Sequence, residues 1–170
     1  QHQAYPKRVL DSNYPVPILF ARGATGALNP GRAVACVGSR QIRPPFSDRQ
    51  DEFARCATGA AFSVVSGFAL GADSIAHRAS FETGGSTVCV MPGGLDRPFP
   101  PENREFWRQL LDYPKAVFVS ESPFGSLASS LSLRKRNKLI LSFAQGVLVG
   151  QSSNRGGAMN AYRFSIEQHK

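Results

Sequence analysis

Four cationic residues stand within five positions, in the segment Arg134-Lys135-Arg136-Asn137-Lys138. The residues around them predict a helix over 133–144, so the cations lie near its beginning. Cations there are opposed by the positive end of the helix dipole. A nearby anion relieves that repulsion, which favours phosphate contact over the alternative, a solvated basic helix surface.

The whole chain is basic, with a formal net charge of +8 over 170 residues and an isoelectric point near 9.9. Residues 86–170 carry eleven lysine and arginine residues against six acidic ones, so the excess is partly focused. Such a distribution is typical of proteins that contact phosphates. A generally basic soluble surface explains the charge equally well.

Small residues follow several apolar runs, at Gly38-Ser39-Arg40, Ser66-Gly67, Pro92-Gly93-Gly94 and Gln151-Ser152-Ser153. Small side chains let an anion approach backbone N–H groups at helix N-termini closely. The alternative is that each glycine only makes a tight turn. Several such loops at one edge of a sheet, one of them carrying an arginine, favour an anion site.

These loops fall where a regular alternation of elements would place them together. Apolar runs typical of buried strands occupy 18–21, 33–37, 62–65, 86–91, 116–120 and 146–150, and helix-like stretches occupy 47–61, 73–82, 100–111, 133–144 and 157–168, the first capped by Ser47. This order predicts an α/β fold with a doubly wound, mostly parallel sheet and helices on both faces. We expect a single domain in which a lead-in strand and turn, 1–32, pack on a core, 33–170. Ligands of such sheets bind beyond the carboxyl ends of the strands.

A catalytic role is the weaker interpretation of the remaining polar residues. His77 stands one helical turn after Asp73 and could be a general base, but Asp73 more simply caps the helix and hydrogen-bonds to His77. The segment 92–94 resembles part of the lysine-decarboxylase-like phosphoribohydrolases, yet Leu95-Asp96-Arg97-Pro98 follows where those enzymes carry Gly-Thr and a glutamate. We therefore expect no catalytic residue and no enzyme activity.

The cysteines and apolar runs indicate the compartment. Cys36, Cys56 and Cys89 form no Cys-x-x-Cys pair, so the sequence predicts neither a metal site nor a redox motif, only buried thiols in a reducing compartment. No run is long enough to span a bilayer, and the N-terminus has no signal-peptide pattern. We expect a cytoplasmic protein without membrane contact.

The segment Val65 to His77, with its Ser-Gly, Gly-x-Asp and Ala-His pattern, closely resembles the DNA-processing protein A (Smf) family. The resemblance continues in order over most of the chain, at residues 14–15, 19–23, 37–40, 93–97, 100–103, 120–123, 136–140 and 157–168. The chain departs from the family at Leu70, where an arginine is usual, and at Leu133-Arg134, where Phe-Pro is usual. The first change removes one cation, and the second removes a base-stacking ring but adds a charge at Arg134.

The resemblance implies an extended Rossmann-like core that binds single-stranded DNA and loads a RecA-type recombinase, acting as a homodimer without a metal or cofactor. It implies phosphate contacts by Arg40 and by the pair Arg136 and Lys138, and a groove shaped by the loops at Ser66-Gly67 and Gly93-Gly94. We expect Arg40 and Arg136 to contact the same ligand. The candidate DNA-binding residues are Gly38, Ser39, Arg40, Ser66, Gly67, Gly71, Gly93, Gly94, Arg134, Lys135, Arg136, Asn137 and Lys138, with Asp73 and His77 as a structural motif. The alternative is a nucleotide-sensing domain of the same superfamily.

Aromatic side chains add little to the candidate site. Phe106 and Trp107 lie in an amphipathic stretch that predicts a place in the core. Phe99 and Phe124 lie in predicted loops and are weak candidates for stacking on bases.

Overall fold

A twisted sheet with the strand order β1-β5-β4-β3-β2-β6 lies at the centre of the computed structural model, which describes residues 5–154 and 156–167. Its strands are β1 (Phe20–Gly23), β2 (Ala33–Val37), β3 (Ser63–Ser66), β4 (Thr87–Val90), β5 (Ala116–Ser120) and β6 (Gly146–Val149). β1 pairs with β5 antiparallel, and all other described pairs are parallel. The predicted doubly wound, mostly parallel α/β sheet is confirmed.

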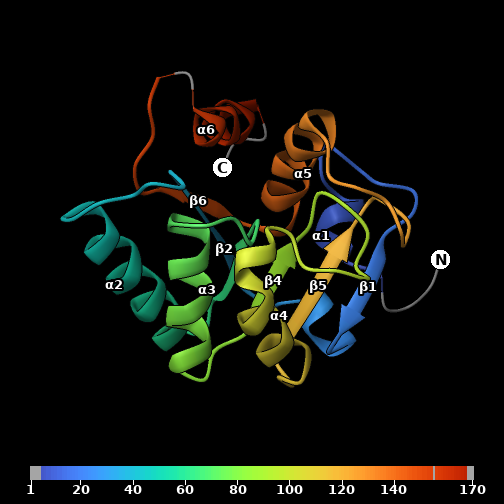
Figure 1. Ribbon diagram of the computed structural model, residues 1–170, viewed down its shortest axis with the longest axis horizontal. Coiled ribbons are helices and arrows are strands. Elements are labelled where there is room, and N and C mark those ends of the chain that lie inside the picture. Colours follow the sequence, from blue (N-terminus) through green and yellow to red (C-terminus); the bar gives the residue numbers. More distant parts are fainter. Residues whose placement is uncertain (1–4, 155, 168–170) are drawn as a thin grey trace.

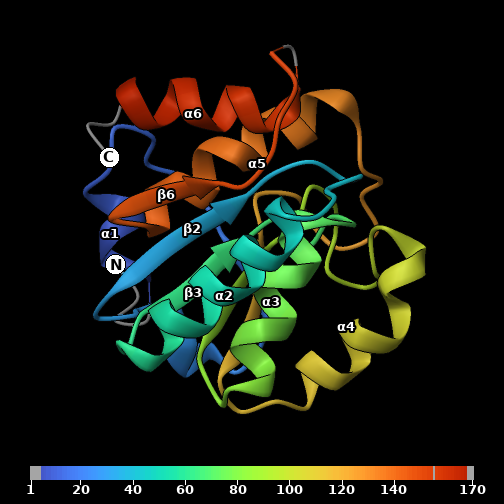
Figure 2. The ribbon, with the colours of Figure 1, turned by 90° about the vertical axis from the view of Figure 1, so that its left-hand side faces the viewer.

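Helices cover both faces of this sheet, as Figure 2 shows. On one side lie α2 (Phe46–Gly59), α3 (Ala72–Glu82) and α4 (Arg104–Leu111), and on the other lie α1 (Lys7–Leu10), α5 (Ser130–Phe143) and α6 (Gly157–Glu167). Two short 3-10 helices, η1 (Thr25–Leu28) and η2 (Pro101–Asn103), complete the described elements. Within the described ranges no helix has the length and apolar character needed to cross a membrane.

The order of the strands reverses between β2 and β6. From β2 the chain adds β3, β4 and β5 in one direction, and α5 then carries it back across the sheet to β6 on the other side of β2. After β2 the chain enters α2 on one face, whereas after β6 it enters α6 on the opposite face. Such a topological switch point leaves a crevice at the carboxyl ends of the two strands, where ligands of α/β sheets bind.

Alternating strand residues build an apolar layer on each face of the sheet. Val117 and Val119 face the layer that contains Leu139 and Phe143 of α5, while Phe118 packs in the layer of α4. In that second layer Phe106 and Trp107 are buried, so their predicted place in the core is confirmed. Burying one such aromatic or aliphatic side chain contributes roughly 1.5–3 kcal/mol, so both layers hold the helices firmly on the sheet.

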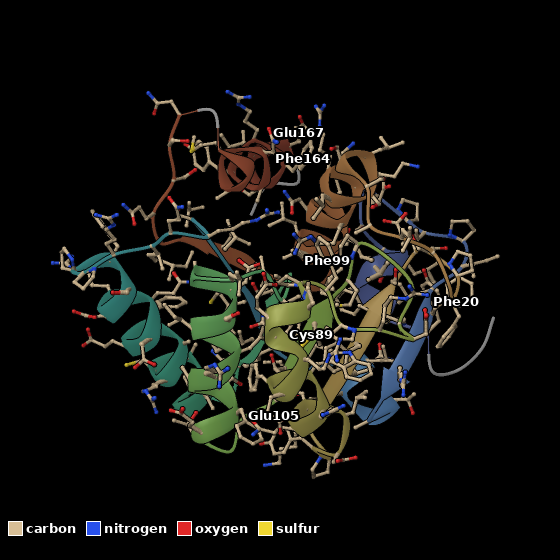
Figure 3. The ribbon with its side chains drawn as sticks, in the orientation of Figure 1. Phe20, Cys89, Phe99, Glu105, Phe164 and Glu167 are labelled. Carbon is tan, nitrogen blue, oxygen red and sulfur yellow. The ribbon has the colours of Figure 1, made fainter. Side chains whose placement is uncertain are left out.

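The thiols are distributed less uniformly than predicted. Cys36 and Cys89 are buried in β2 and β4, and Figure 3 shows Cys89 in the middle of the molecule. Cys56 is exposed on α2, so the prediction of a buried thiol was wrong there. It lies on the solvent side of a helix whose buried residues are Gln50 and Ala54.

Several predicted boundaries need correction. α2 begins at Phe46 without a side-chain cap, because Pro45 stands at the cap position. Ser47 lies inside the helix, where its hydroxyl donates to the Asp48 carboxylate. α5 begins three residues earlier than predicted, since Ser129 and Ser132 form a reciprocal capping box. The short helix α1 was not predicted, and the predicted end of the last helix at Gln168 lies outside the described residues.

Asp73 and His77 do not form the predicted cap and hydrogen bond. The residue before α3 is Gly71, and the Asp73 carboxylate turns back toward the preceding loop. His77 is fully buried, with Nδ1 2.6 Å from Oγ1 of Thr87. Burial lowers the pKa of His77 to about 3, because a charged ring in the core would lose its hydration.

This burial predicts a specific pH dependence of folding. The unfolded state protonates His77 near pH 6.5 and the folded state only near pH 3, so its contribution to stability is complete above pH 6.5 and is lost as the pH falls toward 3. Urea unfolding of the wild type and His77→Gln between pH 7 and 5 should show a steeper loss for the wild type, by up to about 1.4 kcal/mol per pH unit. Parallel pH profiles would contradict this assignment.

Candidate nucleic-acid interface

The loop after β2 is built around glycines that leave no room for a side chain. The Ser39 N–H donates to the Gln151 carbonyl at 2.7 Å, and the Ala72 N–H donates to the Ser39 carbonyl at 3.1 Å. Gly71 has a φ of +74°, and a Cβ there would lie 2.4 Å from the Ser39 carbonyl oxygen. The loop is therefore fixed between the start of α3 and the chain leaving β6, and it holds Arg40 in solvent.

A pocket of about 580 Å³ opens beside this loop, at the switch point between β2 and β6. Its wall carries three guanidinium groups, those of Arg40, Arg134 and Arg136, together with the amides of Asn137 and Asn160. The hydroxyls of the loop after β6 complete the polar lining, with Ser152 and Ser153. Cations and neutral donors on one concave wall form a site for an anion.

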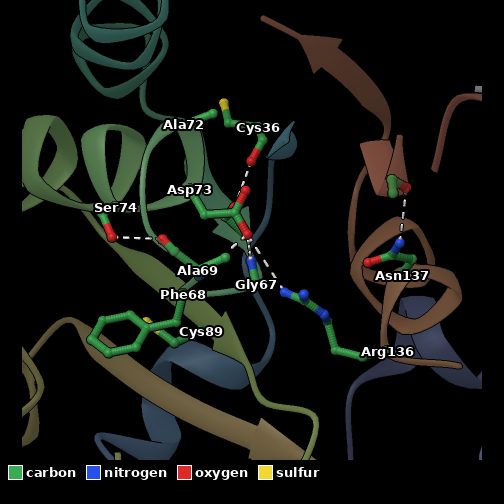
Figure 4. Close-up of polar contacts among 12 residues, drawn as sticks. Cys36, Gly67, Phe68, Ala69, Ala72, Asp73, Ser74, Cys89, Arg136 and Asn137 are labelled. Atoms are coloured by element: carbon green, nitrogen blue, oxygen red, sulfur yellow. Dashed lines mark hydrogen bonds and ion pairs between the residues drawn. The ribbon is translucent and has the colours of Figure 1, made fainter. Parts of the chain in front are cut away.

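A buried ion pair forms the floor of this site. Arg136 Nη1 lies 3.5 Å from Asp73 Oδ2, and both side chains are more than nine-tenths buried, at 8% and 7% exposure. Asp73 Oδ2 also accepts the backbone N–H groups of Gly67 at 3.1 Å and Ala69 at 3.4 Å, as Figure 4 shows. A Cβ on Gly67 would lie 1.0 Å from Arg136 Nη1, so the guanidinium occupies the space that a side chain would take.

Burial shifts the titration of both partners. It raises the pKa of Asp73 and lowers the pKa of Arg136, while the attraction between the two opposes each shift. The positive charge of Arg40 further lowers the pKa of Arg136, so the two guanidinium groups repel each other across the pocket. An anion placed between them removes this repulsion.

Arg136 also keeps an unused donor. Its Nε is buried and has no hydrogen-bond partner among the described residues. A buried donor without a partner costs roughly 1–3 kcal/mol. An acceptor atom of a ligand bound beside Arg136 would satisfy this donor.

The basic segment of α5 does not act as one patch. Arg134 and Asn137 face the pocket, but the Asn137 amide donates to the Gly157 carbonyl at 3.2 Å. Lys138 Nζ stands 5.2 Å from the ring centre of Tyr14 and 4.9 Å from that of Phe164, which Figure 3 labels on α6. Because the helix begins at Ser130, the cations lie beyond its first turn, and the predicted opposition to the helix dipole was wrong.

The other glycine loops are used for packing. The Ser66 hydroxyl donates to the Cys36 carbonyl inside the sheet. A Cβ on Gly93 would lie 2.9 Å from the Ser126 carbonyl oxygen, and one on Gly94 2.7 Å from the Pro123 carbonyl oxygen. These glycines let the segment 123–128 close over the end of β4, and they do not line the pocket.

The structure thus brings together only part of the predicted set. The pocket is lined by Gly38, Ser39, Arg40, Asp73, Arg134, Arg136 and Asn137. It is not lined by Ser66, Gly67, Gly71, Gly93, Gly94, Lys135 or Lys138. Sequence reasoning missed Gln41 and Asn160. Gln41 directly follows the predicted loop Gly38-Ser39-Arg40, so the sequence indicates it. Asn160 lies in α6, and only the tertiary fold brings α6 to the pocket.

The comparisons with known proteins agree with this architecture. The family model of DNA recombination-mediator protein A matches residues 1–170. The chain is 28% identical to protein Smf of Synechocystis over 169 residues, 96% of this chain and 41% of that protein. The chain belongs to the DNA recombination-mediator protein A family.

Two solved structures share the fold. DNA processing protein A from Helicobacter pylori, for which a single-stranded DNA binding mode is described, has a TM-score of 0.89 at 25% identity, covering 97% of this chain and 74% of that chain. DNA processing protein A from Streptococcus pneumoniae has a TM-score of 0.90 at 26% identity, covering 99% and 58%. The chain spans between 41% and 55% of the curated relatives from Synechocystis, Borreliella burgdorferi, Bacillus subtilis and Escherichia coli.

Within residues 5–154 and 156–167, no three histidine, cysteine or acidic side chains lie close enough together to hold a metal ion. The charged groups at the pocket are an arginine set and one carboxylate already engaged by Arg136 and backbone N–H groups.

The floor of the pocket predicts a sharp difference between two glycine substitutions. Gly67→Ala should push the Arg136 guanidinium off Asp73 and leave a buried carboxylate short of its counter-ion, at a cost of about 3–5 kcal/mol. Gly146→Ala is the control, because no atom lies within 4 Å of its Cβ position, and alanine is favoured in strands by roughly 0.5–1 kcal/mol. Urea unfolding of both variants measures the difference, and equal stabilities would contradict the packing described here.

Proposed function

We propose that this chain binds single-stranded DNA, with backbone phosphates held in the pocket between β2 and β6. The observation that carries the proposal is the convergence of Arg40, Arg134 and Arg136 on one pocket wall in a chain of net charge +8. A concave site of about 580 Å³ suits one flexible strand better than a rigid duplex. Single-strand binding proteins characteristically follow the backbone with such a positive groove.

The relationship to DNA processing protein A supports the choice of ligand. The single-stranded DNA binding mode described for the Helicobacter pylori protein concerns a chain with the same fold at 25% identity. Arg40 and Arg136 stand in the segments that carry the family resemblance, and both line the pocket. Leu70 stands where the family has an arginine, and Leu133 where it has a phenylalanine. We therefore expect affinity to depend on the arginines that line the pocket, Arg40, Arg134 and Arg136.

Two further parts of the proposal rest on the family alone. They are the loading of a RecA-type recombinase onto the bound strand and action as a homodimer in the cytoplasm, in DNA recombination and natural transformation. The chain spans about half the length of the Bacillus subtilis relative, at 55%. We therefore give these activities as proposals, and filament assembly on coated single-stranded DNA would test the first of them.

A second candidate function follows from the size of the pocket. About 580 Å³ is enough for one nucleotide, so a small phosphorylated ligand could occupy the same wall in a nucleotide-sensing domain. The two functions differ in how binding depends on ligand length. Affinity that rises from a mononucleotide to an oligonucleotide of about 20 bases supports DNA binding, and saturable binding of the mononucleotide alone supports sensing.

Phosphate binding predicts a steep dependence on salt. Each neutralised phosphate of a single strand contributes a slope of about −0.7 in log affinity against log salt concentration. Three arginines give a slope near −2, or roughly a twentyfold loss between 50 and 200 mM salt. Fluorescence anisotropy with a labelled oligonucleotide of about 20 thymidines measures this slope, and a flat response would contradict the proposal.

Replacing one arginine locates the binding site. Arg40→Ala should weaken binding by roughly 1–3 kcal/mol, because one charge-assisted contact to phosphate is lost. Lys115→Ala removes the same charge just before β5, at the opposite ends of the strands, and should leave affinity within twofold. Equal effects of the two substitutions would mean that binding follows net charge and that the pocket is not the site.

Hydrolysis of nucleotides is the enzymatic alternative to exclude. The sequence after Gly93-Gly94 lacks the Gly-Thr and glutamate of the phosphoribohydrolases. The carboxylate of Asp96 instead accepts hydrogen bonds from the Gly125 N–H and from Arg97. We expect no base release when the protein is incubated with AMP. Turnover that disappears in Asp73→Ala or Asp96→Ala would show that the domain is an enzyme.

A further inference from the structure

A second cavity, of about 200 Å³, lies next to the pocket between β2 and β6 and shares Arg136 with it. It is formed where the chain leaves β4 and β5 and where α5 begins. Its wall includes the carboxylate of Glu121, the ammonium group of Lys135 and the exposed side chain of Leu131. An acid, a cation and an apolar surface around so small a space are the groups that recognise a nucleobase.

Two side chains of this wall have unused hydrogen-bonding atoms. Glu121 Oε2 accepts from the Tyr14 hydroxyl at 3.3 Å, but Oε1 is shielded from solvent and has no partner among the described residues. Arg136, more than nine-tenths buried, likewise keeps Nε without a partner. Rotation about the last bond of a glutamate side chain is soft, so a ligand in the cavity can engage the free carboxylate oxygen.

Glu121, Lys135 and Arg136 are the charged groups of the cavity wall. The hydroxyls of Ser129 and Ser132 are bound to each other's backbone N–H groups in the capping box of α5. Met91 is buried beneath them, and Leu131 is 64% exposed at the rim. A flat ring can therefore lie against Leu131 while its edge reaches the carboxylate and the ammonium group.

We propose that this cavity binds one base of the strand whose phosphates occupy the neighbouring pocket, and that it prefers guanine. Guanine presents two adjacent N–H donors, at N1 and N2, to a carboxylate such as Glu121, and its O6 accepts from a cation such as Lys135 or Arg136. Thymine presents a single N–H between two carbonyl groups and leaves one carboxylate oxygen unused. The inference rests on the proposed function, because the base arrives with a bound strand.

The test compares oligonucleotides that differ at one base. The wild type should bind a 20-mer of thymidines with one central guanosine roughly 5- to 100-fold more tightly than the all-thymidine 20-mer, which is the usual discrimination of a paired base contact. Glu121→Gln should reduce this ratio to about one. Glu105→Gln removes the same charge from the exposed surface of α4 and should keep the wild-type ratio.

The outcomes separate this inference from the proposed function. Binding of the all-thymidine strand without preference for guanosine overturns the base site and leaves single-stranded DNA binding in place. Absence of binding to both strands overturns the proposed function and the inference with it. Lys135→Met, at an exposed position of α5, serves as the test if Glu121→Gln does not fold. It should lower the ratio of the two affinities, and an unchanged ratio would contradict the base site.

Discussion

The buried ion pair between Asp73 and Arg136 is the contact on which the candidate site depends. It joins the loop after β3 and the start of α3 to α5, which packs on the opposite face of the sheet. Replacing a buried pair by apolar residues is often neutral for stability, whereas removing one partner is costly. We therefore interpret this pair as a positioning device. Asp73, held by two backbone N–H groups, fixes a guanidinium at the floor of the pocket.

The switch point between β2 and β6 creates the crevice beside that guanidinium. The chain leaves β2 toward one face of the sheet and leaves β6 toward the other, so the crevice between them opens beside Arg136. Arg40 faces the same crevice, and its charge disfavours the charged form of Arg136. Because these two cations repel each other, an anion bound between them is stabilised by both. This arrangement connects the topology of the sheet to the proposed binding of a nucleic-acid backbone.

Much of the fold, but less of the site, could be predicted from the sequence. Uninterrupted apolar runs such as Ala33–Val37 indicate buried parallel strands, and the structure contains them. The capping box at Ser129 places the start of α5 three residues before the predicted one, so the cations of α5 lie beyond its first turn. The spacing of Asp73 and His77 suggested a contact within the helix, yet each pairs with a distant residue, Arg136 or Thr87. Contacts of that kind depend on tertiary packing, which no local pattern encodes.

We propose that Arg40 and Arg136 hold a phosphate between them while Asp73 keeps Arg136 in place. A crystal structure of the protein with a short thymidine oligonucleotide tests this most directly. We expect a backbone phosphate within hydrogen-bond distance of both guanidinium groups, with the contact between Arg136 and Asp73 intact. A strand bound elsewhere on the surface, or bound in the pocket with no contact to Arg136, would contradict it.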